Sequence, residues 1–99
     1  MVGKNLKWAC LELGGNDPFI VLEDADIDLA VKLGIQSWLA NSGQTCINAK
    51  RFIIDSKVYD EFSSKLKEQL RQVKIGNPLL ETTQVGPLAN CHQVKWLYD

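Results

Sequence analysis

Two short apolar runs, each followed by a stretch with helical spacing, constrain this chain more than any other feature. Residues 18–22 and 50–54 have the length and apolar character of strands. Residues 26–40 and 58–73 place apolar side chains three and four positions apart, as helices do. A strand, a helix and a second strand form a βαβ unit, in which the strands are parallel and the crossover is right-handed. The sequence therefore predicts an α/β fold built on a βαβα unit with parallel strands.

Boundary residues support this division. Asp24 or Asp26 can cap the first helix, and Asp55 or Ser56 can cap the second. Gly76 follows the second helix as a stop signal. Both helices are therefore expected to end within the chain, with loops between them and the strands.

Further segments flank the βαβα unit. Residues 8–13 alternate loosely between apolar and polar before a glycine pair, which predicts a strand that ends in a turn. Residues 41–48 and 79–89 lack a period and are expected to be loops, and residues 90–99 are expected to begin another helix. Two parallel strands cannot cover their own faces, so we expect the unit to be part of a larger domain.

Composition excludes several classes of protein. The 99 residues allow about one domain. The net charge is −1 and the basic residues are scattered, so nucleic acid is not an expected partner. No apolar run reaches the roughly 20 residues of a membrane span, and early lysines argue against a signal peptide. Three widely spaced cysteines favour a reducing compartment, and the cytoplasm is the expected location.

Cys46 is the first candidate for chemistry. It lies in a glycine-containing loop after the first predicted helix, with Lys50 and Arg51 close in sequence. Positive charge near an accessible cysteine stabilises the reactive thiolate. The alternative is a buried, inert cysteine that acts as a small apolar side chain.

Glu12 is the second candidate. It stands between Leu11 and Leu13, just before Gly14 and Gly15. Apolar surroundings would raise the pKa of the carboxyl group by desolvation, which suits a general base. The alternative is an outward-facing charge on an edge strand.

Other chemical sites are not predicted. The only histidine, His92, adjoins Cys91 in the C-terminal tail, where a Cys-His hydrolase pair has little support. Cys10, Cys46, Cys91 and His92 lack the paired spacing of zinc ligands, so no metal site is expected.

Two segments together resemble the signature motifs of the aldehyde dehydrogenase superfamily. Residues 11–15 (LELGG) resemble its glutamate motif, and residues 41–46 (NSGQTC) resemble its cysteine motif, in the family's order and spacing. Residues 16–26 and the short segments 76–78 and 86–88 are also similar to sequences of this family. The resemblance covers roughly residues 3–89. Within the superfamily, the sequence is most similar to succinate-semialdehyde dehydrogenases.

The resemblance implies a mechanism. Cys46 would attack an aldehyde carbonyl, hydride would pass from the thiohemiacetal to a nicotinamide ring, and Glu12 would activate water to hydrolyse the thioester. The Cys46 backbone N–H would help to hold the oxyanion, together with an asparagine that this chain lacks. By the same analogy, Leu13 and Gly14 would lie against the nicotinamide, and Thr45 and Ile47 would line the aldehyde pocket.

The resemblance also implies a division of the chain as part of a longer enzyme. Residues 1–15 would be the last strand and turn leading from a cofactor domain, residues 16–89 the N-terminal part of the catalytic domain, and residues 90–99 an atypical tail. The cofactor would be NAD or NADP, with its adenosine and pyrophosphate sites outside the chain. Arg51 and Arg71 have no evident path to a semialdehyde carboxylate.

Two other functions stay open. The chain could be a non-catalytic fragment that only associates with a partner chain, or Cys46 and Glu12 could transfer acyl groups as an esterase without a nicotinamide. Exposed apolar surface on such a piece predicts a homo-oligomer or association with the remainder of the enzyme. The expected partner in catalysis is a small-molecule aldehyde.

Overall fold

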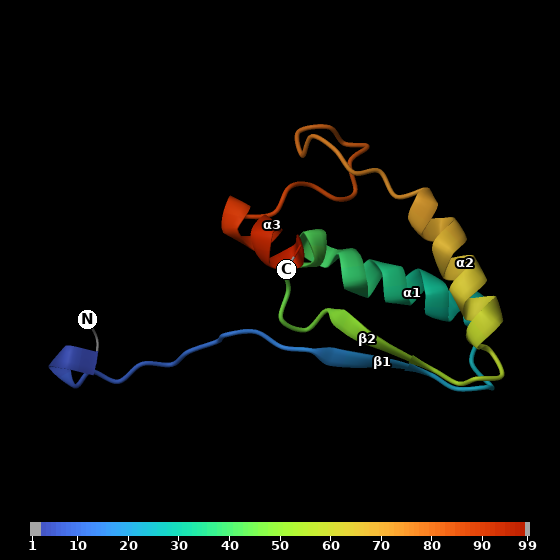
Figure 1. The fold of residues 1–99 in the computed structure, drawn as a ribbon, viewed down its shortest axis with the longest axis horizontal. Coiled ribbons are helices and arrows are strands. Elements are labelled where there is room, and N and C mark those ends of the chain that lie inside the picture. Colours follow the sequence, from blue (N-terminus) through green and yellow to red (C-terminus); the bar gives the residue numbers. More distant parts are fainter. Residues whose placement is uncertain (1–2, 99) are drawn as a thin grey trace.

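The computed structural model describes residues 3–98, and its central part is the predicted βαβα unit (Figure 1). Strand β1 leads through helix α1 to the parallel strand β2 and then to helix α2. The α/β prediction is confirmed. The elements in order are a 3-10 turn (Gly3–Asn5), β1 (Asp17–Val21), α1 (Ile27–Leu39), a 3-10 turn (Ala40–Gly43), β2 (Ala49–Ile54), α2 (Tyr59–Arg71) and α3 (Cys91–Tyr98).

The two strands pair in parallel with one irregularity. Phe19 pairs with Phe52, and the register continues to the ends of both strands. At the start of the ladder Asp17 pairs with Ala49 and Pro18 with Arg51, so Lys50 is an extra residue opposite no partner. This is a β-bulge, which bends a strand and re-aims its side chains.

The core lies between the sheet, α1 and α2. Val21, Ile27, Val31 and Phe62 are buried there. Gly34 lets α1 approach the sheet, because a Cβ at that position would lie 2.9 Å from Cε1 of Phe52. α1 covers one face of the sheet (Figure 1).

The opposite face of the sheet is largely uncovered within residues 3–98. Ile20 and Ile53 are 60% and 49% exposed there. A continuous apolar run such as residues 18–22 is typical of a strand that is covered on both faces, and within residues 3–98 only one face is covered.

The predicted strand over residues 8–13 is wrong for the described part of the chain. These residues are extended, exposed and unpaired, and they run away from the βαβα unit (Figure 1). Alternation favours a strand only where a neighbouring strand can take its hydrogen bonds, and none lies beside them in residues 3–98. The radius of gyration is accordingly 17.4 Å, against about 13 Å for a compact domain of this size.

The cap predicted for the first helix is present in the structure, and the cap predicted for the second helix is not. The side chain of Asp26 accepts a hydrogen bond from the Leu29 N–H at 3.0 Å and caps α1. α2 begins later than expected, and its N-cap residue Val58 makes no side-chain cap. Asp55 instead accepts from the Lys57 N–H at 2.9 Å in the preceding turn.

Helix α3 confirms the helix expected over residues 90–99, as far as the structure describes them. Across residues 3–98, no helix combines the length and the apolar character needed to cross a bilayer.

Candidate functional site

A cleft of about 680 Å³ contains most of the residues that the sequence nominates. Residues 12–15, which precede β1, form one wall, and the end of α1 with the loop before β2 forms another. Leu88 and residues of α3 complete it. A volume of this size is within the range of small-molecule sites.

The loop that carries Cys46 is anchored at its base by a buried asparagine. Asn48 is 3% exposed, and its amide nitrogen donates to the carbonyls of Trp38 (3.2 Å) and Ala40 (3.0 Å). The last carbonyls of a helix have no partner within the helix. Asn48 therefore satisfies these groups at the end of α1 and holds the loop against it.

The same loop contains three successive residues with left-handed backbones. Asn41, Ser42 and Gly43 have φ values of 51°, 58° and 78°. Glycine and asparagine tolerate this region, but serine is strained there. The surrounding hydrogen bonds therefore have to hold the turn that leads to Cys46.

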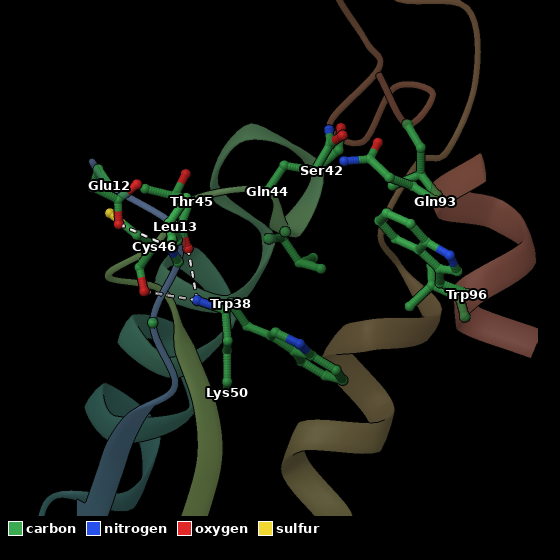
Figure 2. Close-up of a pocket in the computed structure, with 16 residues that line it drawn as sticks. Glu12, Leu13, Trp38, Ser42, Gln44, Thr45, Cys46, Lys50, Gln93 and Trp96 are labelled. Carbon is green, nitrogen blue, oxygen red and sulfur yellow. Dashed lines mark hydrogen bonds between the residues drawn. The ribbon is translucent and has the colours of Figure 1, made fainter. Parts of the chain in front are cut away.

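Cys46 itself is half-buried in a tight turn. The Asn48 N–H donates to the Thr45 carbonyl at 3.2 Å. The Lys50 ammonium group donates to the Thr45 carbonyl at 2.7 Å and to the Cys46 carbonyl at 2.8 Å. Figure 2 shows Lys50 reaching both oxygens. Of the two predicted cationic neighbours, Lys50 contacts the loop, whereas Arg51 donates to the Asn16 carbonyl at 2.9 Å.

Glu12 lies beside Cys46 at one end of the cleft (Figure 2). One of its carboxylate oxygens accepts a hydrogen bond from the Gly14 N–H at 3.0 Å. The apolar surroundings predicted for Glu12 are absent from the described residues, because its side chain is exposed. Desolvation therefore does not support a general base in this structure.

Gly15 connects the two walls. A Cβ at Gly15 would lie 2.5 Å from the Cys46 carbonyl oxygen, so only glycine allows this approach. Gly14 has a φ of 123° and open space where a side chain would be. The glycine pair thus brings the Glu12 segment against the Cys46 loop and leaves the cleft wall beside Glu12 open.

The structure brings five of the six nominated residues into this cleft. Glu12, Leu13, Gly14, Thr45 and Cys46 line it. Ile47 is not among its lining residues and is 72% exposed. Ile47 follows Cys46 in the turn, and its side chain is exposed outside the cleft.

Sequence reasoning missed two side chains that join the Cys46 loop to residues 86–89. Ser42 Oγ accepts a hydrogen bond from the Gly86 N–H at 3.1 Å. Gln44 Oε1 accepts one from the Ala89 N–H at 2.8 Å. Short polar side chains in a loop often bind backbone groups. The resemblance of residues 86–88 to the sequences of the family was the one signal in the sequence that could have drawn attention to this contact.

The other end of the cleft is apolar. Trp38 and Leu39 of α1 and Leu88 lie near Trp96 and Leu97 of α3. Figure 2 shows Trp96 and Gln93 well apart from Glu12 and Cys46. Cys10 and Cys91 are exposed and do not line this cleft.

Comparisons with known proteins agree with this geometry. The profile of the Aldehyde dehydrogenase family matches residues 1–99, the tail of residues 90–99 included. A probable succinate-semialdehyde dehydrogenase [NADP(+)] from Synechocystis sp. is 51% identical over 84 residues, which are 85% of this chain and 18% of that protein. The succinate-semialdehyde dehydrogenase [NADP(+)] of Mycobacterium avium is 48% identical over 89 residues, 90% of this chain and 19% of that protein.

Solved structures give the same result. Succinate-semialdehyde dehydrogenase from Burkholderia pseudomallei superposes with a TM-score of 0.84 at 43% identity, over 94% of this chain and 19% of that one. Lactaldehyde dehydrogenase from Escherichia coli superposes with a TM-score of 0.86 at 41% identity, over 94% of this chain and 20% of that one. The chain thus spans about a fifth of the length of these relatives. It belongs to the aldehyde dehydrogenase family.

Proposed function

We propose that this chain supplies the nucleophile and the general base of an NAD(P)-dependent aldehyde dehydrogenase, with Cys46 and Glu12 in these roles. The observation that carries the proposal is their shared cleft, in which Gly15 brings the backbone of the Glu12 segment against the Cys46 carbonyl. Two residues that act at successive steps on one carbon atom have to lie at the same site.

Cys46 acts first. Its thiolate adds to the carbonyl carbon of an aldehyde, and the carbonyl oxygen becomes an alkoxide. The half-buried position of Cys46 leaves the sulfur accessible to a substrate in the cleft. Hydride loss from this adduct leaves a thioester on Cys46.

The residues beside the catalytic pair fit a flat ring. Gly14 has no atom within 4 Å of the position that its Cβ would occupy. Leu13 and Gly14 would hold the nicotinamide of NAD or NADP against this open wall. When bound, the cofactor supplies the hydride acceptor.

Glu12 acts on the thioester. Its carboxylate takes a proton from water, the resulting hydroxide adds to the thioester carbon, and the Cys46 thiolate leaves. The product is a carboxylic acid. The hydrogen bond from the Gly14 N–H orients one carboxylate oxygen and leaves the other free for water.

The substrate that we propose is a semialdehyde, succinate semialdehyde first. Support comes from the relatives, which include succinate-semialdehyde dehydrogenases [NADP(+)]. Neither Arg51 nor Arg71 lines the cleft, so a group that binds the distal carboxylate would come from another part of the enzyme. The proposed location is the cytoplasm.

A chimeric enzyme tests this function. Residues 3–89 of this chain replace the corresponding segment of the Synechocystis relative, which supplies the rest of the enzyme. The chimera should reduce NADP with succinate semialdehyde, and Cys46→Ser should abolish this turnover. Glu12→Gln should keep a first-turnover burst of NADPH and lose steady-state turnover, whereas Cys10→Ser should retain both, because Cys10 does not line the cleft.

Other outcomes would contradict the proposal. Turnover by the Cys46→Ser chimera would remove Cys46 from the mechanism. A folded chimera without turnover would favour a fragment that only associates with a partner. Ester hydrolysis without any aldehyde-dependent reduction of NADP would favour acyl transfer alone.

A further inference from the structure

Lys50 is the one cationic residue among the described residues that line the cleft, and the mechanism above does not use it. It is the extra residue of the β2 bulge. Simple alternation along the strand would place it with Phe52 and Ile54, which pack against the core. At the bulge its side chain instead reaches the carbonyls of the Cys46 loop.

Lys50 holds the backbone on both sides of the nucleophile. Its ammonium group donates to the Thr45 carbonyl at 2.7 Å and the Cys46 carbonyl at 2.8 Å. Hydrogen bonds from a charged donor are stronger than neutral ones. From the opposite wall, Gly15 approaches the Cys46 carbonyl so closely that a Cβ there would clash at 2.5 Å. The peptide units around Cys46 are therefore restrained from two sides, by Lys50 of β2 and by the backbone at Gly15.

This restraint determines where the Cys46 N–H points. The Thr45 carbonyl and the Cys46 N–H belong to one peptide unit, which is trans, so the two groups point in opposite directions. Because Lys50 binds the carbonyl, the N–H is directed away from Lys50. Within residues 3–98 this N–H has no hydrogen-bond acceptor.

A free N–H on the nucleophile's own residue is well placed to stabilise the oxyanion that forms when the nucleophile adds to a carbonyl. We propose that Lys50 is a positioning residue that orients the Cys46 N–H as an oxyanion donor. The role rests on the proposed function. Lys50 acts through the backbone and touches neither the substrate nor the reacting carbon.

Two reactions of Cys46 separate this role from an effect on the thiol. Iodoacetamide alkylates the thiolate with loss of iodide from a saturated carbon, so no oxyanion forms. p-Nitrophenyl acetate acylates it through addition to a carbonyl, followed by loss of p-nitrophenolate, so an oxyanion forms. The ratio of the two rate constants at Cys46, read by peptide mass spectrometry apart from Cys10 and Cys91, isolates the oxyanion donor.

We expect Lys50→Met to lower acylation of Cys46 in the 99-residue chain by roughly 10- to 100-fold, with alkylation reduced less than about threefold. Lys50→Arg should restore most of the acylation rate, since a guanidinium group can also donate to both carbonyls. Arg51→Met is the matched control, because Arg51 is adjacent and cationic and binds a carbonyl outside the loop, that of Asn16. It should leave the ratio unchanged.

Three results would overturn the inference. An equal fall of both rates in Lys50→Met would show that its charge stabilises the thiolate. An unchanged ratio would show no positioning. Acylation of Cys46 no faster in the native chain than in urea would show that the loop presents no oxyanion donor. The Cys46→Ser chimera tests the proposed function separately: if it is inactive while the ratio is unchanged here, only the role of Lys50 is refuted.

Discussion

The two proposed catalytic residues lie on segments that the rest of the chain holds in place to very different extents. The Cys46 loop is bound to α1 by Asn48, to residues 86–89 by Ser42 and Gln44, and to β2 by Lys50. In the described chain, residues 8–14 have one hydrogen bond, from the Gly14 N–H to Glu12. The nucleophile is thus preorganised by this chain's own side chains, whereas the base depends on the contact at Gly15.

Hydrogen exchange should show the largest difference between these segments. Amides of residues 8–14 should exchange near the intrinsic rate, because they are exposed and unpaired. Amides of β2 and of Asn48 should be protected by about 100-fold or more. Mass spectrometry of peptides from the two segments measures both. Equal protection would mean that residues 8–14 pair with another strand in solution.

Gly15→Ala should break the contact between the segments. The new Cβ would lie 2.5 Å from the Cys46 carbonyl oxygen, so the backbone of one segment has to shift. We expect acylation of Cys46 by p-nitrophenyl acetate to fall by roughly 10- to 100-fold, since a displacement of about 1 Å costs that much. Gly3→Ala, where a Cβ meets nothing within 4 Å, is the control. An unchanged rate in Gly15→Ala would show that the contact does not position Cys46.

Asn48→Ala should lower the free energy of unfolding, because Asn48 anchors the Cys46 loop to the end of α1. Removing the amide leaves the Trp38 and Ala40 carbonyls without their donor in a partly buried site, at a cost of about 1–3 kcal/mol. Asn16→Ala makes the same change just after the other segment, residues 8–14. Its side chain is exposed, so the free energy of unfolding should change by less than about 0.5 kcal/mol. Urea unfolding followed by circular dichroism measures both, and equal costs would contradict the comparison.

The sequence predicted local features well and long-range ones poorly. The spacing of apolar residues placed both strands and both helices, because each period depends on residues close in the chain. The strand predicted for residues 8–13 failed, since alternation does not reveal whether a partner strand exists. Asn48 was missed for a related reason: in a polar loop it resembles an exposed residue, and only the folded chain brings it to the end of α1.

The candidate site shows the same division. The motifs nominated Cys46 and Glu12, and the structure places both in one cleft. Spacing could not predict where Lys50 points, because its direction follows from a one-residue shift in the pairing of two strands. The apolar surroundings expected for Glu12 were inferred from its sequence neighbours, whereas exposure depends on what packs over them.

The smallest effect concerns the helix that carries the Cys46 loop. Lys65 of α2 pairs with Asp28 of α1 at 2.7 Å and with Glu61 at 2.8 Å. Hydrogen bonds to these carboxylates raise the pKa of Lys65 above its ordinary value of 10.5. A raised pKa in the folded state contributes stability that is fully present below pH 10.5 and is lost as the pH rises toward the folded-state value.

Lys65→Met should therefore lower the melting temperature slightly between pH 7 and 9, by an amount limited by solvent screening. The difference from the unsubstituted chain should narrow above pH 10.5, where Lys65 of the unfolded chain loses its charge. Lys67→Met is the control, because Lys67 forms no ion pair among the described residues. Since the Lys65–Asp28 pair joins α1 to α2, the Lys65–Glu61 pair lies within α2, and neither touches residues 8–14, Lys65→Met should leave hydrogen exchange of that segment unchanged. A difference in melting temperature that widens above pH 10.5 would show that other groups dominate at this contact.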